Sequence, residues 1–277
     1  MPLTEQEKSE LKARARQLRQ DIVDVTVWSG GAHIGGALSS ADLMVALYFK
    51  YARVRPQEPE WPDRDRIILS KGHSGVGLAA VLALKGYFPR DLLRQFNHFK
   101  SPFGMHLDGN KVKGVDASTG SLGHGLPISV GLALGARFQK QTWRVYCLLG
   151  DGECNEGAIW ESAMSAAHFK LDRVTAIVDR NRLMIDGATE QVMALEPFAE
   201  KWRAFGWHVI EIDGHDFDAI GRAIEKAHAT AGQPTVIVAN TIKGRGVDFM
   251  ENQVKWHYGS MDSALADKAK QSIARMS

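Results

Sequence analysis

The chain has 277 residues, with 34 Lys and Arg against 32 Asp and Glu, and its basic residues are spread along its length rather than gathered into one run. The net charge of +2 disfavours nucleic acid as the default partner. Two cysteines argue against a disulfide framework, and neither a signal peptide nor an apolar run of about 18 residues is present, so we expect a cytoplasmic protein that does not enter a membrane.

The first half of the chain mixes helical patterns with glycine-rich breaks. A helix is predicted over 4–28, where Thr4 and Glu7 are spaced like a capping box, and a break follows at 30–36. We predict a second helix over 40–51, a surface loop over 56–62, a buried strand over 67–70 and a helix over 77–84. The segment 98–125 is rich in glycine and lacks periodicity, and a loop of this length inside a compact domain is usually functional.

The second half alternates between strands and helices. Strand-like runs cover 145–149, 174–178, 208–212 and 235–239, and helical stretches near 156–169, 196–205 and 216–231 separate them. This alternation predicts an α/β fold of three layers, a doubly wound, mainly parallel sheet with helices on both faces. No linker divides the sequence, so we predict a single domain over 1–277 with an amino-terminal helical extension over about 1–30.

Two strand ends in this half carry candidate metal ligands. Asp151 follows the strand at 145–149, and Asn181 follows the strand at 174–178. Ligands of open parallel sheets bind beyond the carboxyl ends of the strands. A carboxylate oxygen of Asp151, the amide oxygen of Asn181 and the carbonyl of Leu183 would supply three oxygens to an octahedral magnesium ion, with a diphosphate and a water completing the shell.

The residues around Asp151 favour a phosphate group in the same place. Gly150 and Gly152 allow a tight turn and a close approach of the backbone, and a helix beginning near Glu156 would present free amides to a diphosphate. The alternative is a pair of ordinary strand-end turns, because Asp-Gly and Asn are common turn residues. The position at two consecutive strand ends favours the diphosphate and magnesium site.

These residues resemble the thiamine diphosphate signature, in particular its transketolase version. The resemblance extends from about residue 10 to 260, and the segments that carry it are 32–36, 65–73, His106, 119–125, 150–152, 156–157, 179–181, 185–187 and 256–259. No single segment is specific to this family, but the whole set of segments is. The resemblance implies the thiamine diphosphate-binding fold, with Mg²⁺ (or Ca²⁺ or Mn²⁺) bound by Asp151, Asn181 and the Leu183 carbonyl.

Histidines near glycines form a second group of candidate site residues. Imidazole can donate or accept a hydrogen bond and move a proton near neutral pH, which suits a pocket for a polyol. The resemblance implies that His33, His106 and His257 contact sugar hydroxyls and assist proton transfer, and that His73 contacts the cofactor. Without the resemblance, each of these four residues could be a structural histidine. Zinc is a weaker alternative, because no close histidine pair has the spacing of metal ligands.

The resemblance assigns further roles and also shows departures. It implies that the cofactor lies against Gly120, Ser121, Leu122, Gly152, Glu156, Asn181 and His257. Glu156 and Glu161 match interface glutamates in a hydrogen-bonded path between two active sites, so Glu156 also counts as catalytic. His124 stands where the family usually has glutamine and Lys71 where many members have asparagine, which affects the expected substrate preference.

The sequence has no counterpart of the pyrimidine-binding domain or of its activating glutamate, and the family resemblance therefore implies a separate carboxy-terminal subunit. The expected assembly is a heterotetramer with two copies of each subunit. The expected activity is transfer of a two-carbon ketol unit from a ketose to an aldose, phosphorylated or otherwise modified. Two alternatives are another thiamine diphosphate reaction, such as 2-oxoacid decarboxylation or deoxyketose phosphate synthesis, and a non-catalytic regulatory half.

Overall fold

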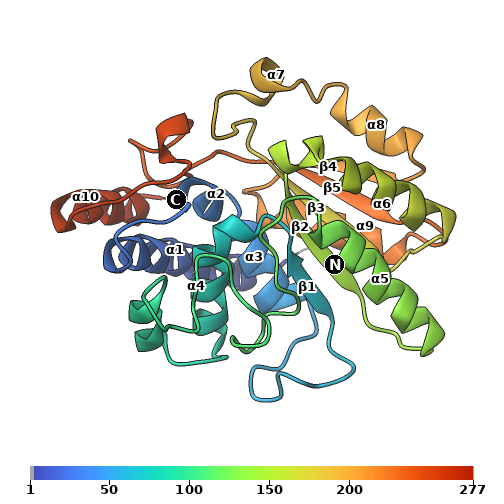
Figure 1. The fold of residues 1–277 in the computed structure, drawn as a ribbon, viewed down its shortest axis with the longest axis horizontal. Helices are drawn as coiled ribbons and strands as arrows, with labels where there is room; N and C mark the ends of the chain where they lie inside the picture. Colours follow the sequence, from blue (N-terminus) through green and yellow to red (C-terminus); the bar gives the residue numbers. More distant parts are fainter. Residues whose placement is uncertain (1–2, 277) are drawn as a thin grey trace.

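Five parallel strands form one sheet in the computed structural model, which describes residues 3–276 (Figure 1). The strands are β1 (Arg66–Leu69), β2 (Val145–Gly150), β3 (Val174–Arg180), β4 (His208–Asp213) and β5 (Thr235–Asn240), in the spatial order β1-β2-β3-β5-β4. All four neighbouring pairs are parallel. The five predicted strands are thus confirmed to within two residues at each end, and their carboxyl ends lie on one edge of the sheet.

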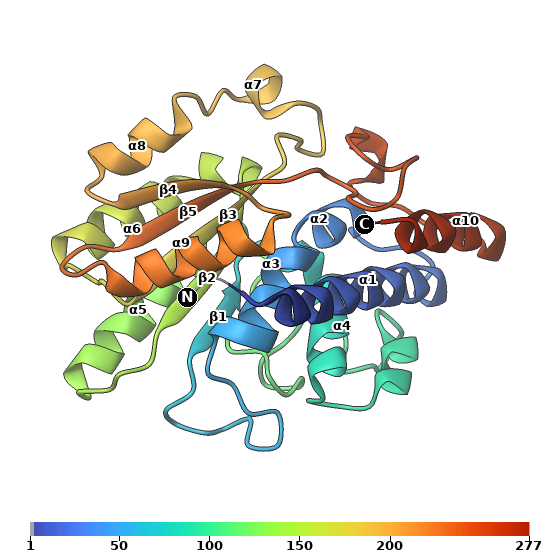
Figure 2. The same ribbon diagram turned by 180° about the vertical axis from the view of Figure 1, so that it is seen from behind.

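Helices cover both faces of this sheet, as the views from the two sides show (Figure 1, Figure 2). One buried cluster contains Tyr146, Leu148 and Ile177 together with helices on one face, whereas Cys147 and Val178 belong to the cluster on the other face. This alternation of side chains follows from the two-residue period of a strand. The predicted three-layer α/β class is therefore confirmed.

The helices are α1 (Glu5–Trp28), α2 (Ile34–Ser39), α3 (Ala41–Ala46), α4 (Gly75–Lys85), α5 (Gly125–Phe138), α6 (Gly157–His168), α7 (Thr189–Val192), α8 (Phe198–Ala204), α9 (Phe217–Ala229) and α10 (Ser263–Ala274). The first face carries α1, α3, α4, α9 and α10, and the second carries α5, α6 and α8. Within residues 3–276, no helix combines the length and the apolar character needed to cross a membrane.

The amino-terminal helix begins as predicted, with Thr4 accepting from the Glu7 amide while the Glu7 carboxylate accepts from the Thr4 amide. It then packs against α3, α4 and α10 and contributes Leu18 and Ile22 to the main buried cluster. The described residues of the predicted extension over about 1–30 therefore belong to the same hydrophobic core as the sheet. Residues 1, 2 and 277 of the predicted single domain lie outside the described residues.

Two local predictions differ from the structure, and two of the longer helices were not predicted. The predicted glycine-rich break at 30–36 ends early, because α2 begins at Ile34 and buries Gly35 and Gly36. The helix predicted over 40–51 consists of α3 and a π-helical turn over Leu47–Tyr51. Helices α5 and α10 were not predicted: three glycines and a proline weaken the helical pattern of α5, whereas packing and an Asp262 cap stabilise α10.

Candidate functional site

A cavity of about 310 Å³ lies at the carboxyl edge of the sheet. Residues following β1, β2, β3 and β5 form much of its wall, and the loops before α2 and α5 and near residue 257 complete it. Its lining residues are His33, Gly36, Lys71, His73, Gly120, Leu122, Gly150, Asp151, Gly152, Glu153, Asn181, Leu183, Met184, Ile185, Lys243 and His257. Segments far apart in the sequence therefore converge where ligands bind in open parallel sheets.

The three predicted metal ligands all line this cavity. Asp151 is 2% exposed, its Oδ1 accepts from the Gly152 amide at 2.8 Å, and its Oδ2 accepts from the Arg182 amide at 2.5 Å. The Asn181 Oδ1 accepts from the Leu183 amide at 3.1 Å, which brings these two residues together. Strands β2 and β3 place the two turns side by side, because Gly150 pairs with Asp179.

The electrostatics of this corner fit a cation. Burial raises the pKa of Asp151, and the neighbouring carboxylate of Asp179 raises it further. The Leu183 carbonyl accepts a hydrogen bond from the Lys243 ammonium at 2.8 Å, so a metal ion bound at this oxygen would have to replace that ammonium. Carboxylate, amide and carbonyl oxygens are the donors that Mg²⁺ and Ca²⁺ prefer. Among residues 3–276, no group of three or more His, Cys, Asp or Glu side chains is arranged to hold a metal ion.

Glycines allow the backbone to enclose the cavity closely. A Cβ on Gly152 would lie 2.8 Å from Cγ of Met184, and a Cβ on Gly120 would lie 3.0 Å from Cδ2 of the His106 ring. Both positions thus leave no room for a larger residue without displacement of a neighbour. The Gly120 contact also places His106 against the loop that carries Gly120 and Leu122, called the glycine loop below. His106 itself is exposed and does not line the cavity.

Three of the predicted histidines form a cluster inside the cavity. The ring centres of His33 and His73 are 5.1 Å apart, those of His33 and His257 are 5.6 Å apart, and those of His73 and His257 are 5.3 Å apart. Paired hydrogen bonds of 3.0 Å between the backbones of Ala32 and Gly259 join the two loops. Residues more than 200 positions apart in the sequence are brought together in this way.

These imidazoles are held in the neutral form. Burial, helped by the charge of Lys71, lowers the pKa of His73 to about 2, and burial with the charge of Lys243 lowers the pKa of His257 to about 3. Burial likewise lowers the pKa of His33. The His33 Nδ1 atom is buried and has no hydrogen-bond partner among the described residues. Buried polar atoms normally have a hydrogen-bond partner. The Nδ1 atom of His33 therefore favours a polar ligand in this part of the cavity.

The remaining predicted site residues lie at the rim. Leu122 lines the cavity, but its neighbour Ser121 is exposed and does not. Glu156 is also exposed, at the start of α6, and a Cβ on Gly123 would lie 2.6 Å from the Glu156 Cβ. Glu161 is exposed on the same helix. The roles predicted for Ser121, Glu156 and His106 therefore stay predictions that require groups beyond this cavity.

Two buried lysines in the cavity were not predicted as site residues. Lys71 forms an ion pair of 2.6 Å with Asp179, and Lys243 contacts the His257 Nδ1 at 2.8 Å. Burial lowers the pKa of Lys243 to about 8. The sequence contained a signal for Lys243, because it follows the predicted strand at 235–239 and immediately precedes Gly244. A lysine at the carboxyl end of a parallel strand is a candidate phosphate ligand.

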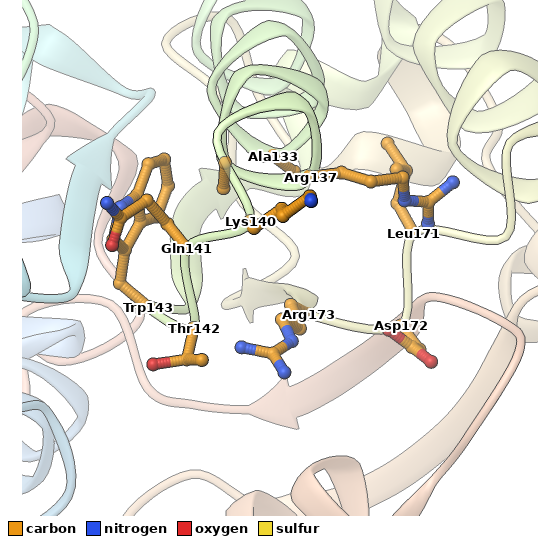
Figure 3. Close-up of a pocket in the computed structure, with 10 residues that line it drawn as sticks. Ala133, Arg137, Lys140, Gln141, Thr142, Trp143, Leu171, Asp172 and Arg173 are labelled. Atoms are coloured by element: carbon orange, nitrogen blue, oxygen red, sulfur yellow. The ribbon is translucent and has the colours of Figure 1, made fainter.

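A second hollow, of about 290 Å³, lies at the opposite end of the sheet, beside the segments that precede β2 and β3 (Figure 3). Arg137, Lys140 and Arg173 lie along it. The Arg137 guanidinium donates to the carbonyls of Phe169 and Lys170, just beyond the carboxyl end of α6. Cations at a helix carboxyl end offset its partial negative charge, which accounts for this arginine without a ligand.

Comparison with known proteins identifies the family. Residues 8–274 match the family model described as transketolase, thiamine diphosphate binding domain. The chain is 43% identical over 252 residues to the 6-deoxy-6-sulfo-D-fructose transketolase subunit SqwG of Clostridium sp. (strain MSTE9), covering 91% of this chain and 92% of that protein. It is 38% identical over 264 residues to an apulose-4-phosphate transketolase subunit of Phocaeicola vulgatus, covering 95% and 94% respectively.

Longer transketolases match over part of their length. Human transketolase is 37% identical over 273 residues, which cover 97% of this chain but 43% of the human protein. The crystal structure of transketolase from Campylobacter jejuni superimposes with a TM-score of 0.88 at 28% identity, covering 98% of this chain and 43% of the other. The chain spans less than half the length of these two proteins. With the family model matching almost the whole sequence, this chain belongs to the transketolase family and corresponds to its thiamine diphosphate-binding domain.

Proposed function

We propose that this chain is the thiamine diphosphate- and magnesium-binding subunit of a two-subunit transketolase. The observation that carries the proposal is the convergence, in one cavity, of Asp151, Asn181 and the Leu183 carbonyl with three neutral histidines. The names of the two most informative relatives, each a transketolase subunit of similar length, support a separate carboxy-terminal partner. That partner would supply the pyrimidine-binding domain and the activating glutamate.

The residues of the cavity divide between holding the cofactor and handling protons. Asp151, Asn181 and the Leu183 carbonyl would hold Mg²⁺, and Gly152, Gly120 and Leu122 would enclose the diphosphate and the rings. Bound thiamine diphosphate supplies a carbon nucleophile that breaks and forms the bond next to a carbonyl. Calcium and manganese share the preference for oxygen ligands and are substitutes to test.

The histidines would move the hydroxyl protons of the sugar. His33 is neutral and its Nδ1 lacks a partner among the described residues, so it can exchange a hydrogen bond with a substrate hydroxyl. An ammonium on Lys243 donates to the His257 Nδ1, which leaves the ring proton on Nε2. His257 can therefore donate from Nε2 to an oxygen in the cavity. His106 would join them in the complete assembly.

Reconstitution tests this function. The chain and its carboxy-terminal partner should together transfer glycolaldehyde units when thiamine diphosphate and Mg²⁺ are present, and neither of the two should be active without the other. Several ketoses should be tested as donors. They should include sugars with a terminal phosphate or sulfonate, because the sugars after which the two relatives are named carry these groups. Release of CO₂ from pyruvate would instead favour the decarboxylase alternative, and cofactor binding without any turnover would favour a regulatory half.

Lys243 provides a prediction for cofactor affinity. Lys243→Met should raise the Kd of the reconstituted complex for thiamine diphosphate at saturating Mg²⁺ about tenfold, because a hydrogen bond to a charged group contributes about 1.5–3 kcal/mol. Titration calorimetry measures this directly. Lys255→Met is the matched control, since Lys255 is exposed and lies outside the cavity. Equal affinities of the two variants would remove Lys243 from the cofactor site.

A cytoplasmic location is part of the proposal. Both cysteines, Cys147 and Cys154, are unpaired and fully buried. Burial raises the pKa of each thiol, so both stay protonated and unreactive. Free thiols of this kind are typical of reducing compartments.

A further inference from the structure

Glu153 is a buried carboxylate for which the proposed chemistry has no use. It belongs to the short 3-10 turn Gly152–Asn155 that follows β2, and it is 3% exposed. Its Oε1 accepts from the Ser70 hydroxyl at 2.5 Å and from the Gly123 amide at 2.9 Å. Its Oε2 accepts from the Gly150 amide at 3.0 Å. Both oxygens are thus engaged by the protein itself, although the side chain lines the cavity.

The three donors belong to three separate segments of the cavity wall. Ser70 directly follows β1 and immediately precedes the segment that carries Lys71 and His73. Gly123 follows the loop with Gly120 and Leu122, and Gly150 precedes the Asp151 turn. One carboxylate therefore joins the end of β1, the glycine loop and the proposed metal turn.

Ser70 extends this connection to a helix. Its hydroxyl oxygen accepts from the amide of Gly125, the first residue of α5, at 3.1 Å. A Cβ on Gly125 would lie 2.3 Å from the Ser70 hydroxyl oxygen, so the two segments are in close contact. Ser70, Gly123 and Gly125 are all buried, and a buried amide that loses its acceptor costs about 1–3 kcal/mol. The Ser70 hydroxyl and the Gly123 amide therefore depend on Glu153 as their acceptor, and the Gly125 amide depends on Ser70.

A carboxylate presents two acceptor oxygens to these three donors. A glutamine offers one carbonyl oxygen, and its amide nitrogen would face either the Gly150 amide or the Ser70 and Gly123 donors. Replacing the carboxylate by an amide would therefore loosen at least one of the three segments.

We propose that Glu153 is a positioning residue that holds the β1 end, the glycine loop and the metal turn in the one arrangement that encloses the diphosphate. The identity of the ligand rests on the proposed function, but the hydrogen bonds do not. Because Glu153 is not one of the reacting groups, its loss should weaken cofactor binding but leave the rate of the chemical step nearly unchanged.

Glu153→Gln in the reconstituted complex tests the inference. At saturating Mg²⁺, its Kd for thiamine diphosphate should rise about 10- to 100-fold, the range seen when supporting groups of a metal site are lost, while kcat at saturating cofactor changes less than about threefold. Amide hydrogen exchange without cofactor should accelerate in peptides covering 119–126 and 149–153. This second readout is independent of ligand and of activity.

Asp65→Asn is the matched control. Asp65 is 1% exposed and also accepts from two backbone amides, those of Arg53 and Arg144, but at the amino end of the sheet. Its substitution should lower the melting temperature without changing the Kd for the cofactor. An equal rise in Kd for both variants would mean general destabilisation and would overturn the inference, as would unchanged exchange and affinity in Glu153→Gln.

A second variant keeps the test informative if Glu153→Gln does not fold. Ser70→Ala removes one of the three donors and should raise the Kd for thiamine diphosphate severalfold and accelerate exchange at 119–126. Wild-type affinity and exchange in this variant would contradict the inference. Failure of the wild-type complex to bind thiamine diphosphate would overturn the proposed function instead, while altered exchange in Glu153→Gln would still support the positioning role.

Discussion

Asp151→Ala should abolish magnesium-dependent binding of thiamine diphosphate and, with it, ketol transfer by the reconstituted complex. Asp151 is the anionic member of the proposed ligand set, and Asn181 and the Leu183 carbonyl are neutral. Substitution of groups that merely support metal ligands costs about 10- to 100-fold in affinity, so loss of the direct carboxylate ligand should cost at least about 100-fold. Titration of the complex with Mg²⁺ at fixed thiamine diphosphate measures the loss.

Asp186→Ala is the control for Asp151→Ala. Asp186 lies in the loop after Asn181, is exposed and does not line the cavity. Removing its charge should leave Mg²⁺ affinity within about twofold of wild type, because exposed charges are screened by salt. Ketol transfer that survives Asp151→Ala would contradict the metal assignment, even if the family and the fold stand.

The buried ion pair between Asp151 and Arg180 does not offset the burial of this carboxylate. Its guanidinium partner Arg180 lies 3.4 Å from Oδ2 and also contacts Glu196 at 2.8 Å. Burial raises the pKa of Asp151 despite this arginine. A carboxylate that remains costly to ionise inside the protein is stabilised by a divalent cation, which offsets the lost hydration.

The sheet and the proximity of the Asp151 and Asn181 turns could be predicted from the sequence because both depend on local patterns. Buried parallel strands appear as short continuous apolar runs, as at 145–149, and the residues that follow such strands meet on one edge. Asp151 and Asn181 could therefore be paired before the structure was known. Helix α5 was missed because three glycines and a proline weaken its helical pattern, so that packing stabilises it, whereas the signals for α10, an Asp262 cap and several alanines, were overlooked.

The groups that hold the site together could not be predicted from such patterns. Asp179 accepts from Lys71, Ser39 and Asn181, which come from three different parts of the chain. A buried network of this kind depends on which side chains meet in space, and no sequence spacing records that. Glu153 was missed for the same reason, since its donors at Ser70 and Gly123 lie 83 and 30 residues away.

His33→Ala should lower kcat/KM of the reconstituted complex for the ketose about 100-fold or more, in the range by which a positioned acid or base accelerates proton transfer. The buried Nδ1 of His33 has no partner among the described residues, and its ring lies 5.6 Å from that of His257. His33→Asn, which retains a polar group near Nδ1, should recover part of the loss. The Kd for thiamine diphosphate should change less than about threefold in both variants, since hydrogen bonds to the sugar do not hold the cofactor.

The neutral state of the cluster gives this prediction a pH signature. Because burial lowers the pKa of His257 to about 3 and that of His73 to about 2, neither ring gains a proton between about pH 8 and pH 5 in the free protein. Lowering the pH through the ordinary histidine range of about 6.5 should therefore not inactivate the complex through these two rings.

His98→Ala is the control for the His33→Ala substitution, because His98 is exposed and contacts the Trp28 carbonyl instead. A His33→Ala complex as active as His98→Ala would exclude His33 from proton transfer and leave His106 and His257 to perform it.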